Sequence, residues 1–254
     1  MIPKIIHYCW FGRGTKNQKI QDYIAGWHKL MPEYQIIEWN EDNFDIHSTL
    51  WTEQAYEAKK WAFVSDYVRL LALYQYGGIY FDTDVEVLKP LDRFLNNDLL
   101  LGFEAKDMPT TAIIGSRPNN PFIQRILTSY RSKAFIKSDG SYDMTPNPYI
   151  FADFLSEIGV KWNGREQAGS SFHIYSSIVF SPNSFSRIWE KPSAKSYTIH
   201  HFDQSWREDK RNTLSFSGRL RRYLVGVARN TFGTKKARDL SQACLKLFSG
   251  KTKP

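Results

Sequence analysis

The segment Ala62–Val85 constrains the fold of this chain more than any other. Apolar residues recur at helical spacing up to Tyr76, and Gly77-Gly78 then stand where a helix usually ends. A short apolar strand follows and stops at Asp82-Thr83-Asp84. Because alternate strand residues point to the same side, the two carboxylates are expected together at an open sheet edge. Such a pair can bind a divalent cation, which can in turn hold a diphosphate.

Strands and helices alternate along the chain on both sides of this segment. Strands are predicted near Lys4–Tyr8, Tyr34–Trp39, Val85–Leu88, Leu99–Phe103, Thr111–Ile114 and Ile174–Phe180, and helices near Lys16–Leu30, Thr52–Lys60, Trp61–Tyr76, Pro121–Tyr130 and Phe151–Ile158. The alternation predicts an α/β fold with a mixed, mostly parallel sheet. The segment Ser138–Pro148 is rich in turn-forming residues and is predicted to be a loop over a site.

The last fifth of the chain differs from the rest in charge. The 254 residues carry a net charge of +8, but residues 207–254 alone hold 13 Lys and Arg against 3 Asp and Glu, a net charge of +10. Two short basic amphipathic helices are predicted there, a pattern typical of segments that bind anionic membranes. We therefore expect a main domain at residues 1–207 and a basic tail at 208–254. Alternatively, the tail helices pack on the main domain and expose a basic face to solvent.

The cysteines and the hydropathy bear on the expected compartment. Cys9 and Cys244 lie far apart and match no metal-binding spacing, which favours a reducing, cytoplasmic environment. No apolar run approaches the roughly 20 residues of a membrane-spanning helix, and the N-terminus shows no cleavable signal pattern. We expect a protein that is soluble or bound peripherally to the inner face of the plasma membrane.

Two charged residues interrupt the apolar helix before the acidic pair. Asp66 and Arg69 are three residues apart and therefore share one helix face. They could form an ordinary surface ion pair, which stabilises a protein little. The rest of the helix is apolar, however, and burying an ion pair is costly. We therefore interpret both side chains as pointing at a bound nucleotide.

Three separated groups of residues together resemble a known family. The matching residues are Ile2–His7 with Trp10–Gly12, then Ser65, Asp66, Arg69 and Tyr76–Val85 (YGGIYFDTDV), and finally His200-His201 with Ser205-Trp206. The pattern resembles the glycosyltransferases with a DXD-containing sugar-binding region (glycosyltransferase family 32), which include initiating α-mannosyltransferases and capsular polysaccharide enzymes. The resemblance covers roughly residues 2–207 and implies a GT-A type α/β sandwich.

The resemblance implies a role for each matching residue. Asp84 would ligate Mn²⁺ or Mg²⁺, and Asp82 would contact the ribose or the ion through water. Asp66 and Arg69 would hold the sugar or phosphates, and Trp10 would lie against the base. The expected catalytic residues are Asp84, Asp82, Trp206 and Arg69; the nucleotide-sugar-binding residues are His7, Trp10, Asp66, Arg69, Tyr80, Asp82, Thr83, Ser205 and Trp206; the metal ligands are Asp82, Asp84 and His201.

Some of these residues have structural alternatives. Trp10 could belong to the core, His7 could be a hydrogen-bonded strand histidine, and His201 could be a turn partner. Glu104, which follows a predicted strand, is only a weak candidate for a sugar or acceptor contact. Where relatives commonly show Gly-Pro before a late helix, this chain has Thr145–Pro148, a segment that could shape the acceptor side.

The function that the resemblance implies is retaining, metal-dependent hexosyl transfer. A hexose or N-acetylhexosamine would move from a nucleotide sugar, UDP being favoured over GDP, to a glycan or lipid-linked acceptor in bacterial capsule or lipopolysaccharide synthesis. One alternative is a metal-dependent nucleotide-sugar phosphohydrolase, but the sequence offers no second acidic motif as its base. Another is a non-catalytic membrane or nucleic-acid adaptor using the tail, which leaves Asp66, Arg69 and the acidic pair unexplained.

Overall fold

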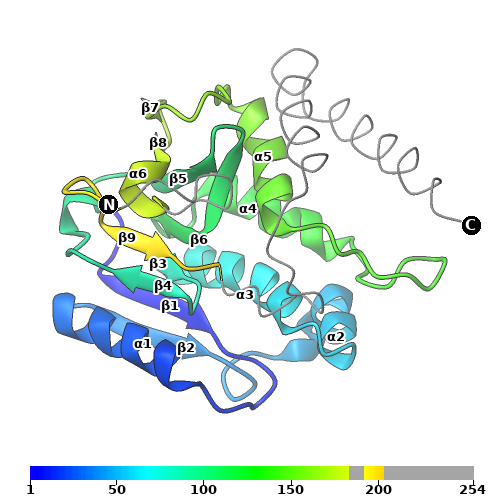
Figure 1. Ribbon diagram of the computed structural model, residues 1–254. Helices are drawn as coiled ribbons and strands as arrows, with labels where there is room; N and C mark the ends of the chain where they lie inside the picture. The colour runs from blue at the N-terminus through cyan, green and yellow to red at the C-terminus, as the bar shows by residue number, and fades with distance from the viewer. Residues whose placement is uncertain (183–191, 203–254) are drawn as a thin grey trace, which may run out of the picture.

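A seven-stranded sheet forms the centre of the structure, a computed structural model that describes residues 1–182 and 192–202 (Figure 1). The strands lie in the order β2-β1-β3-β6-β5-β8-β7. They are β1 (Ile5–Cys9), β2 (Gln35–Trp39), β3 (Gly78–Phe81), β5 (Leu99–Ala105), β6 (Met108–Ser116), β7 (Gln167–Ala168) and β8 (His173–Tyr175). A separate ribbon pairs β4 (Val85–Val87) with β9 (Thr198–His200).

The directions of the strands confirm the predicted mixed, mostly parallel sheet. Strands β2, β1 and β3 are parallel, as are β5 and β8, whereas β6 runs antiparallel to both β3 and β5. Strand β7 is antiparallel to β8. Within the described residues, five strands of the sheet therefore point one way and two the other. The α/β class expected for a GT-A type chain is confirmed.

Helices cover both faces of the sheet. They are α1 (Gln18–Leu30), α2 (Leu50–Glu57), α3 (Trp61–Tyr76), α4 (Pro121–Arg131), α5 (Asn147–Glu157) and α6 (Ser177–Phe180), with 3-10 turns at Ile46–Ser48 and Asp92–Phe94. Helices α2 to α5 share one apolar core, and α1 and α6 contribute to the other. Neighbouring residues of β6 face opposite cores, Ile114 the first and Ile113 the second. None of the helices in the described ranges is long and apolar enough to span a bilayer.

The predicted element bounds hold best where local signals are strong. Asn17 and Asn120 cap α1 and α4 through their side chains, and α3 ends where Gly77 adopts a φ of +66°. The single strand predicted over Ile174–Phe180 is wrong, because β8 ends at Tyr175 and the helical turn α6 follows. Periodicity cannot separate a short buried strand from a buried helical turn. Strand β9 was not predicted.

The Gly77-Gly78 pair fixes the start of β3 against β1. Gly78 has a φ of +98°, and a Cβ atom there would lie 2.5 Å from the Ile5 carbonyl oxygen. We expect Gly78→Ala to lower the free energy of unfolding by about 3 kcal/mol, because the backbone conformation and the clash both oppose the new methyl group. Urea unfolding followed by circular dichroism measures the change.

A second glycine provides the matched control for this prediction. Gly159 has a φ of +87°, but an added Cβ would meet no heavy atom within 4 Å. Gly159→Ala should therefore lower the free energy of unfolding by only about 1–2 kcal/mol, because the backbone conformation alone opposes the new methyl group. Equal losses in the two variants would show that the close approach of β3 to β1 is not what requires Gly78.

Candidate active site

The acidic pair lies at the carboxyl end of β3, where the sequence predicts it. The Asp82 amide donates to the Ala112 carbonyl oxygen of β6 at 2.8 Å. The Tyr80 hydroxyl donates to Asp82 Oδ1 at 2.9 Å. Asp84 follows in the turn that leads into β4, and its carbonyl oxygen accepts from the His201 amide at 3.0 Å. Strands β3 and β6 and the β4-β9 ribbon therefore position the pair.

His200 completes a group of three potential metal ligands with the two acids. In the β4-β9 ribbon His200 pairs with Val85, and its Nε2 lies 3.4 Å from Asp84 Oδ1. One ligand atom from each of Asp82, Asp84 and His200 lies within 4.8 Å of the others. Two carboxylate oxygens and an imidazole nitrogen form a donor set that a divalent cation such as Mn²⁺ can accept. The residues therefore fit the predicted cation.

The charge around His200 is strongly negative. Burial disfavours a proton on the ring, but the carboxylates of Asp84, Glu104 and Asp82 outweigh it and raise the pKa of His200 to about 9. The protonated ring thus balances part of the acidic cluster. A metal ligand must be the neutral imidazole, so a cation would replace this proton as the positive charge of the cluster.

The predicted metal ligand His201 is wrong, because it is His200 that lies beside Asp82 and Asp84. Successive residues of an extended chain point to opposite sides. His201 Nε2 lies 2.9 Å from Glu86 Oε2, and the ring stacks on Tyr23 of α1 at a centroid distance of 5.0 Å. The His-His pair was the right signal, but the sequence could not tell which ring faces the acids.

Arg69 joins the acidic pair to the helix before it. Its guanidinium lies 3.0 Å from Asp66 Oδ1 and 3.3 Å from Asp82 Oδ1, both measured from Nη2. Nη1 donates to the Thr111 carbonyl oxygen at 2.8 Å, and the group lies 4.5 Å from the Tyr80 ring centroid. Arg69 is only 5% exposed, and these contacts hold Asp66 and Asp82 in place. Its expected role in catalysis and in binding the nucleotide sugar stays a prediction.

Asp66 receives a second, unpredicted partner from α5. Asn147 Nδ2 donates to Asp66 Oδ1 at 3.1 Å, across 81 residues of sequence. Burial raises the pKa of the Asp66 carboxyl, and the charge of Arg69 and the Asn147 hydrogen bond oppose that rise. Asn147 lies in the Thr145–Pro148 segment where this chain departs from its relatives, which was the available sequence signal for it.

His7 is structural, which corrects its assignment to nucleotide-sugar binding. Its side chain is fully buried, and Trp39 Nε1 donates to Nδ1 at 3.1 Å. The indole is only a donor, so the ring proton is on Nε2, which donates to the Gly77 carbonyl oxygen at 2.8 Å. Burial outweighs that bond and lowers the pKa of His7 to about 4.

The depressed pKa of His7 predicts a loss of stability in acid. An unfolded histidine with a pKa near 6.5 takes up its proton first, so His7 stabilises the fold fully above pH 6.5 and progressively less as the pH falls towards 4. We expect a loss of about 2.5 kcal/mol by pH 4.5. His7→Gln, which does not titrate, should regain that amount relative to wild type between pH 7.5 and 4.5 in urea unfolding. A pH-independent difference between the two proteins would contradict the assignment.

The remaining predicted residues divide into three groups. Tyr80 is 2% exposed and donates its hydrogen bond to Asp82, and its part in nucleotide-sugar binding stays a prediction. Trp10 follows β1 at the same sheet edge as the acidic pair, is half-buried, and donates from Nε1 to the Gly14 carbonyl oxygen at 2.6 Å. Its contact with a base, like the role of the half-buried Thr83, stays a prediction. Ser205 and Trp206 lie outside the described residues, as do Cys244 and the whole 208–254 tail.

The sequence matches a known family model over a third of its length. Residues 17–101 match the model described as glycosyltransferase sugar-binding region containing DXD motif. The matched region contains Asp66, Arg69, Asp82 and Asp84. It does not reach Asn147 or His200, which the fold brings to the same place.

Two curated relatives and one solved structure are similar to the chain. Inositol phosphoceramide mannosyltransferase 3 of Schizosaccharomyces pombe is 25% identical over 278 aligned residues, covering 100% of this chain and 73% of the relative. Glucan organizing enzyme 1 of Cryptococcus neoformans var. grubii is 40% identical over 84 residues, 29% of this chain and 23% of that protein. The structure of PaToxG glycosyltransferase has a TM-score of 0.47 at 19% identity, covering 62% of this chain and 69% of its own.

Proposed function

We propose that this chain, whose residues 17–101 match the glycosyltransferase sugar-binding region containing DXD motif, transfers a hexosyl group from a nucleoside diphosphate sugar with the help of a divalent cation. The observation that carries the proposal is the grouping of Asp82, Asp84 and His200, whose ligand atoms lie within 4.8 Å of one another. The helix residues Asp66 and Arg69 adjoin this group. Phosphate oxygens and sugar hydroxyls can thus be bound side by side.

The chain's own residues contribute positioning and charge. A cation bound by the acidic pair and His200 supplies positive charge where the departing diphosphate becomes more negative. Arg69 and Tyr80 both bind Asp82 Oδ1 and so fix the orientation of that carboxylate. Asp66 is anchored by Arg69 and Asn147 and would accept hydrogen bonds from sugar hydroxyls. Preorganised groups of this kind need no rearrangement as the charge develops.

The transfer would proceed with retention of configuration, as the family resemblance implies. The acceptor hydroxyl oxygen forms a bond to the anomeric carbon on the face that the diphosphate leaves. The bond between that carbon and the β-phosphate oxygen breaks, and the acceptor proton passes to the departing phosphate oxygen. No protein carboxylate is required as the base in this scheme, which accords with the absence of a second acidic motif in the sequence.

The similar proteins support the class of donor, whereas the acceptor is predicted from the sequence alone. The relatives named mannosyltransferases support a hexosyl donor, with mannose among the candidates, whereas the preference for UDP over GDP stays a prediction from the sequence. A glycan or lipid-linked acceptor in bacterial capsule or lipopolysaccharide synthesis also stays a prediction. So do the cytoplasmic location and the binding of the 208–254 tail to anionic membrane, for which the positive charge of that segment is the support.

Nucleotide release with and without metal tests the proposal. The full-length protein is incubated with UDP- and GDP-linked hexoses and Mn²⁺, and the released nucleoside diphosphate is measured. We expect release with at least one donor, loss of the release in EDTA, and recovery with excess Mn²⁺. Turnover that is indifferent to EDTA would overturn the metal-dependent scheme. Release of nucleoside monophosphate and sugar phosphate would instead establish the phosphohydrolase.

A further inference from the structure

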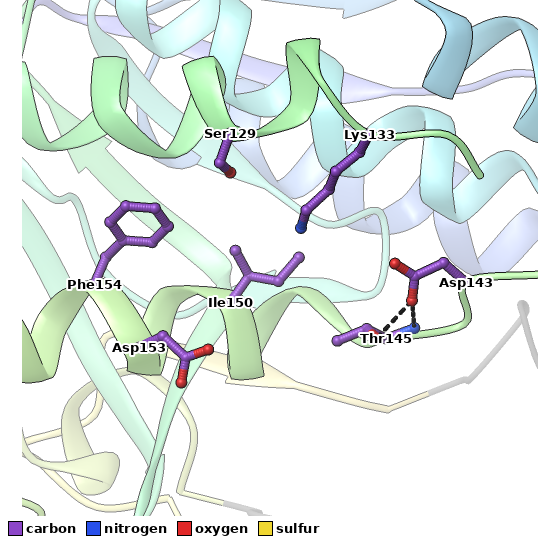
Figure 2. Close-up of a pocket in the computed structure, with 7 residues that line it drawn as sticks. All are labelled: Ser129, Lys133, Asp143, Thr145, Ile150, Asp153 and Phe154. Atoms are coloured by element: carbon purple, nitrogen blue, oxygen red, sulfur yellow. Dashed lines mark hydrogen bonds between the residues drawn. The ribbon is translucent and has the colours of Figure 1, made fainter. Parts of the chain in front are cut away.

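A cavity of about 300 Å³ lies between α4 and α5, outside the residues assigned so far (Figure 2). Its lining combines polar and apolar side chains from both helices and from the loop between them. The lining residues are Ser129, Lys133, Asp143, Thr145, Ile150, Asp153 and Phe154. Only Ile150 is fully buried, and the others are partly exposed, so the cavity is open to solutes.

The lining has the composition of a site for a small polyhydroxylated ring. Carboxylates accept hydrogen bonds from hydroxyls, and an aromatic side chain offers an apolar face to ring C–H groups. The Phe154 ring is held from one side by the Arg125 guanidinium, 5.4 Å from its centroid. Asp143 bonds the Thr145 amide and hydroxyl through one oxygen, Oδ1 (Figure 2), which fixes that carboxylate at the cavity wall.

A chain of polar contacts connects helix α5, which forms one side of the cavity, to the metal-ligand group. Arg69 joins Asp82 to Asp66, and Asp66 is joined to Asn147, the first residue of α5. Asn147 Oδ1 is buried and has no hydrogen-bond partner within the described residues. An unpartnered acceptor of this kind is costly unless a ligand or water satisfies it. Ile150 of the cavity lining stands three residues after Asn147 on the same face of α5, so the cavity adjoins the Asp66 end of these contacts.

We propose that the α4-α5 cavity is the acceptor subsite and binds one hexosyl or cyclitol ring of the acceptor. This inference rests on the proposed transferase function and adds the location and chemical class of the second substrate. The volume lies at the lower end for small-molecule sites, which suits a single ring and not an oligosaccharide. Phe154 stacks on the ring, and the Asp143 and Asp153 carboxylates bind its hydroxyls.

Ligand-observed saturation-transfer NMR tests the subsite without donor or metal. The probes are methyl α-D-mannopyranoside, methyl α-D-glucopyranoside and myo-inositol with the full-length protein in EDTA. We expect at least one probe to bind wild type, and its signal to fall at least fivefold in Asp153→Asn and in Phe154→Leu. Asp22→Asn, which removes an exposed carboxylate on the distant helix α1, should bind like wild type. Thermal unfolding confirms that each variant folds.

The outcomes separate this inference from the proposed function. No binding by wild type, or unchanged binding in both cavity variants, would overturn the subsite. Where a probe serves as acceptor, Asp153→Asn should reduce transfer at least tenfold while leaving Mn²⁺-dependent donor hydrolysis within about twofold. An equal loss of donor hydrolysis would place the donor sugar in the cavity and also overturn the assignment. Absence of Mn²⁺-dependent nucleotide binding would refute the proposed function alone.

Discussion

Asp84→Asn is expected to lower kcat/KM for donor turnover by about 10³-fold, equivalent to about 4 kcal/mol of transition-state stabilisation. Asp84 lies beside Asp82 and 3.4 Å from His200 Nε2, and it is one of three side chains that can hold the cation. The amide keeps the shape of the side chain but loses the negative charge that attracts a divalent ion. Isothermal titration with Mn²⁺ should show the affinity falling together with the turnover.

Three further variants, on the β4-β9 ribbon or directly after it, make this prediction specific. Glu86 lies two residues beyond Asp84, and it binds His201 instead of the ligand group. Glu86→Gln should therefore retain Mn²⁺ affinity within about threefold. His200→Gln should lose Mn²⁺ affinity, whereas His201→Gln should largely keep it. Full metal-dependent activity in Asp84→Asn, or greater sensitivity at His201 than at His200, would contradict the site described above.

Arg69→Met is expected to lower the free energy of unfolding by about 3–5 kcal/mol and to reduce donor turnover at least 10²-fold. The guanidinium is the cation between Asp66 and Asp82, at 3.0 and 3.3 Å, and it is almost completely buried. Without the guanidinium, the carboxylates of Asp66 and Asp82 lose the positive charge that lies between them. The loss of their fixed orientation would weaken both metal and sugar binding. Urea unfolding and metal-dependent turnover measure the two effects.

A double-mutant cycle distinguishes loss of the ion pair from general damage to the core. Asp66→Asn removes one of the two carboxylates, so the double variant Asp66→Asn/Arg69→Met should be destabilised by less than the sum of the single changes. Arg125→Met is the surface control, because Arg125 pairs with Glu157 where both side chains are at least half exposed. Arg125→Met should lower the free energy of unfolding by less than about 1 kcal/mol. Additive effects in the cycle would contradict the bridging role of Arg69.

Most of the fold and the acidic half of the site follow from local sequence signals. The helix Trp61–Tyr76, the glycine pair and the strand before Asp82 are contiguous, so periodicity and turn chemistry identify them together. Alternating strands and helices gave the α/β class for the same reason. The error over Ile174–Phe180 arose where an apolar run is too short for its period to be read. Strand β9 was missed because its partner β4 is distant in sequence.

By itself, the sequence determined that two carboxylates end a buried strand beside a helix that carries Asp66 and Arg69. These relations span few residues, and backbone geometry dictates them. Only the tertiary structure decided that His200 and not His201 faces the acids, that His7 is held by Trp39 and Gly77, and that Asn147 reaches Asp66. Contacts between distant segments depend on how strands pair and helices pack, and single-residue patterns do not record that. The α4-α5 cavity arises in the same way, from the packing of two helices over a loop.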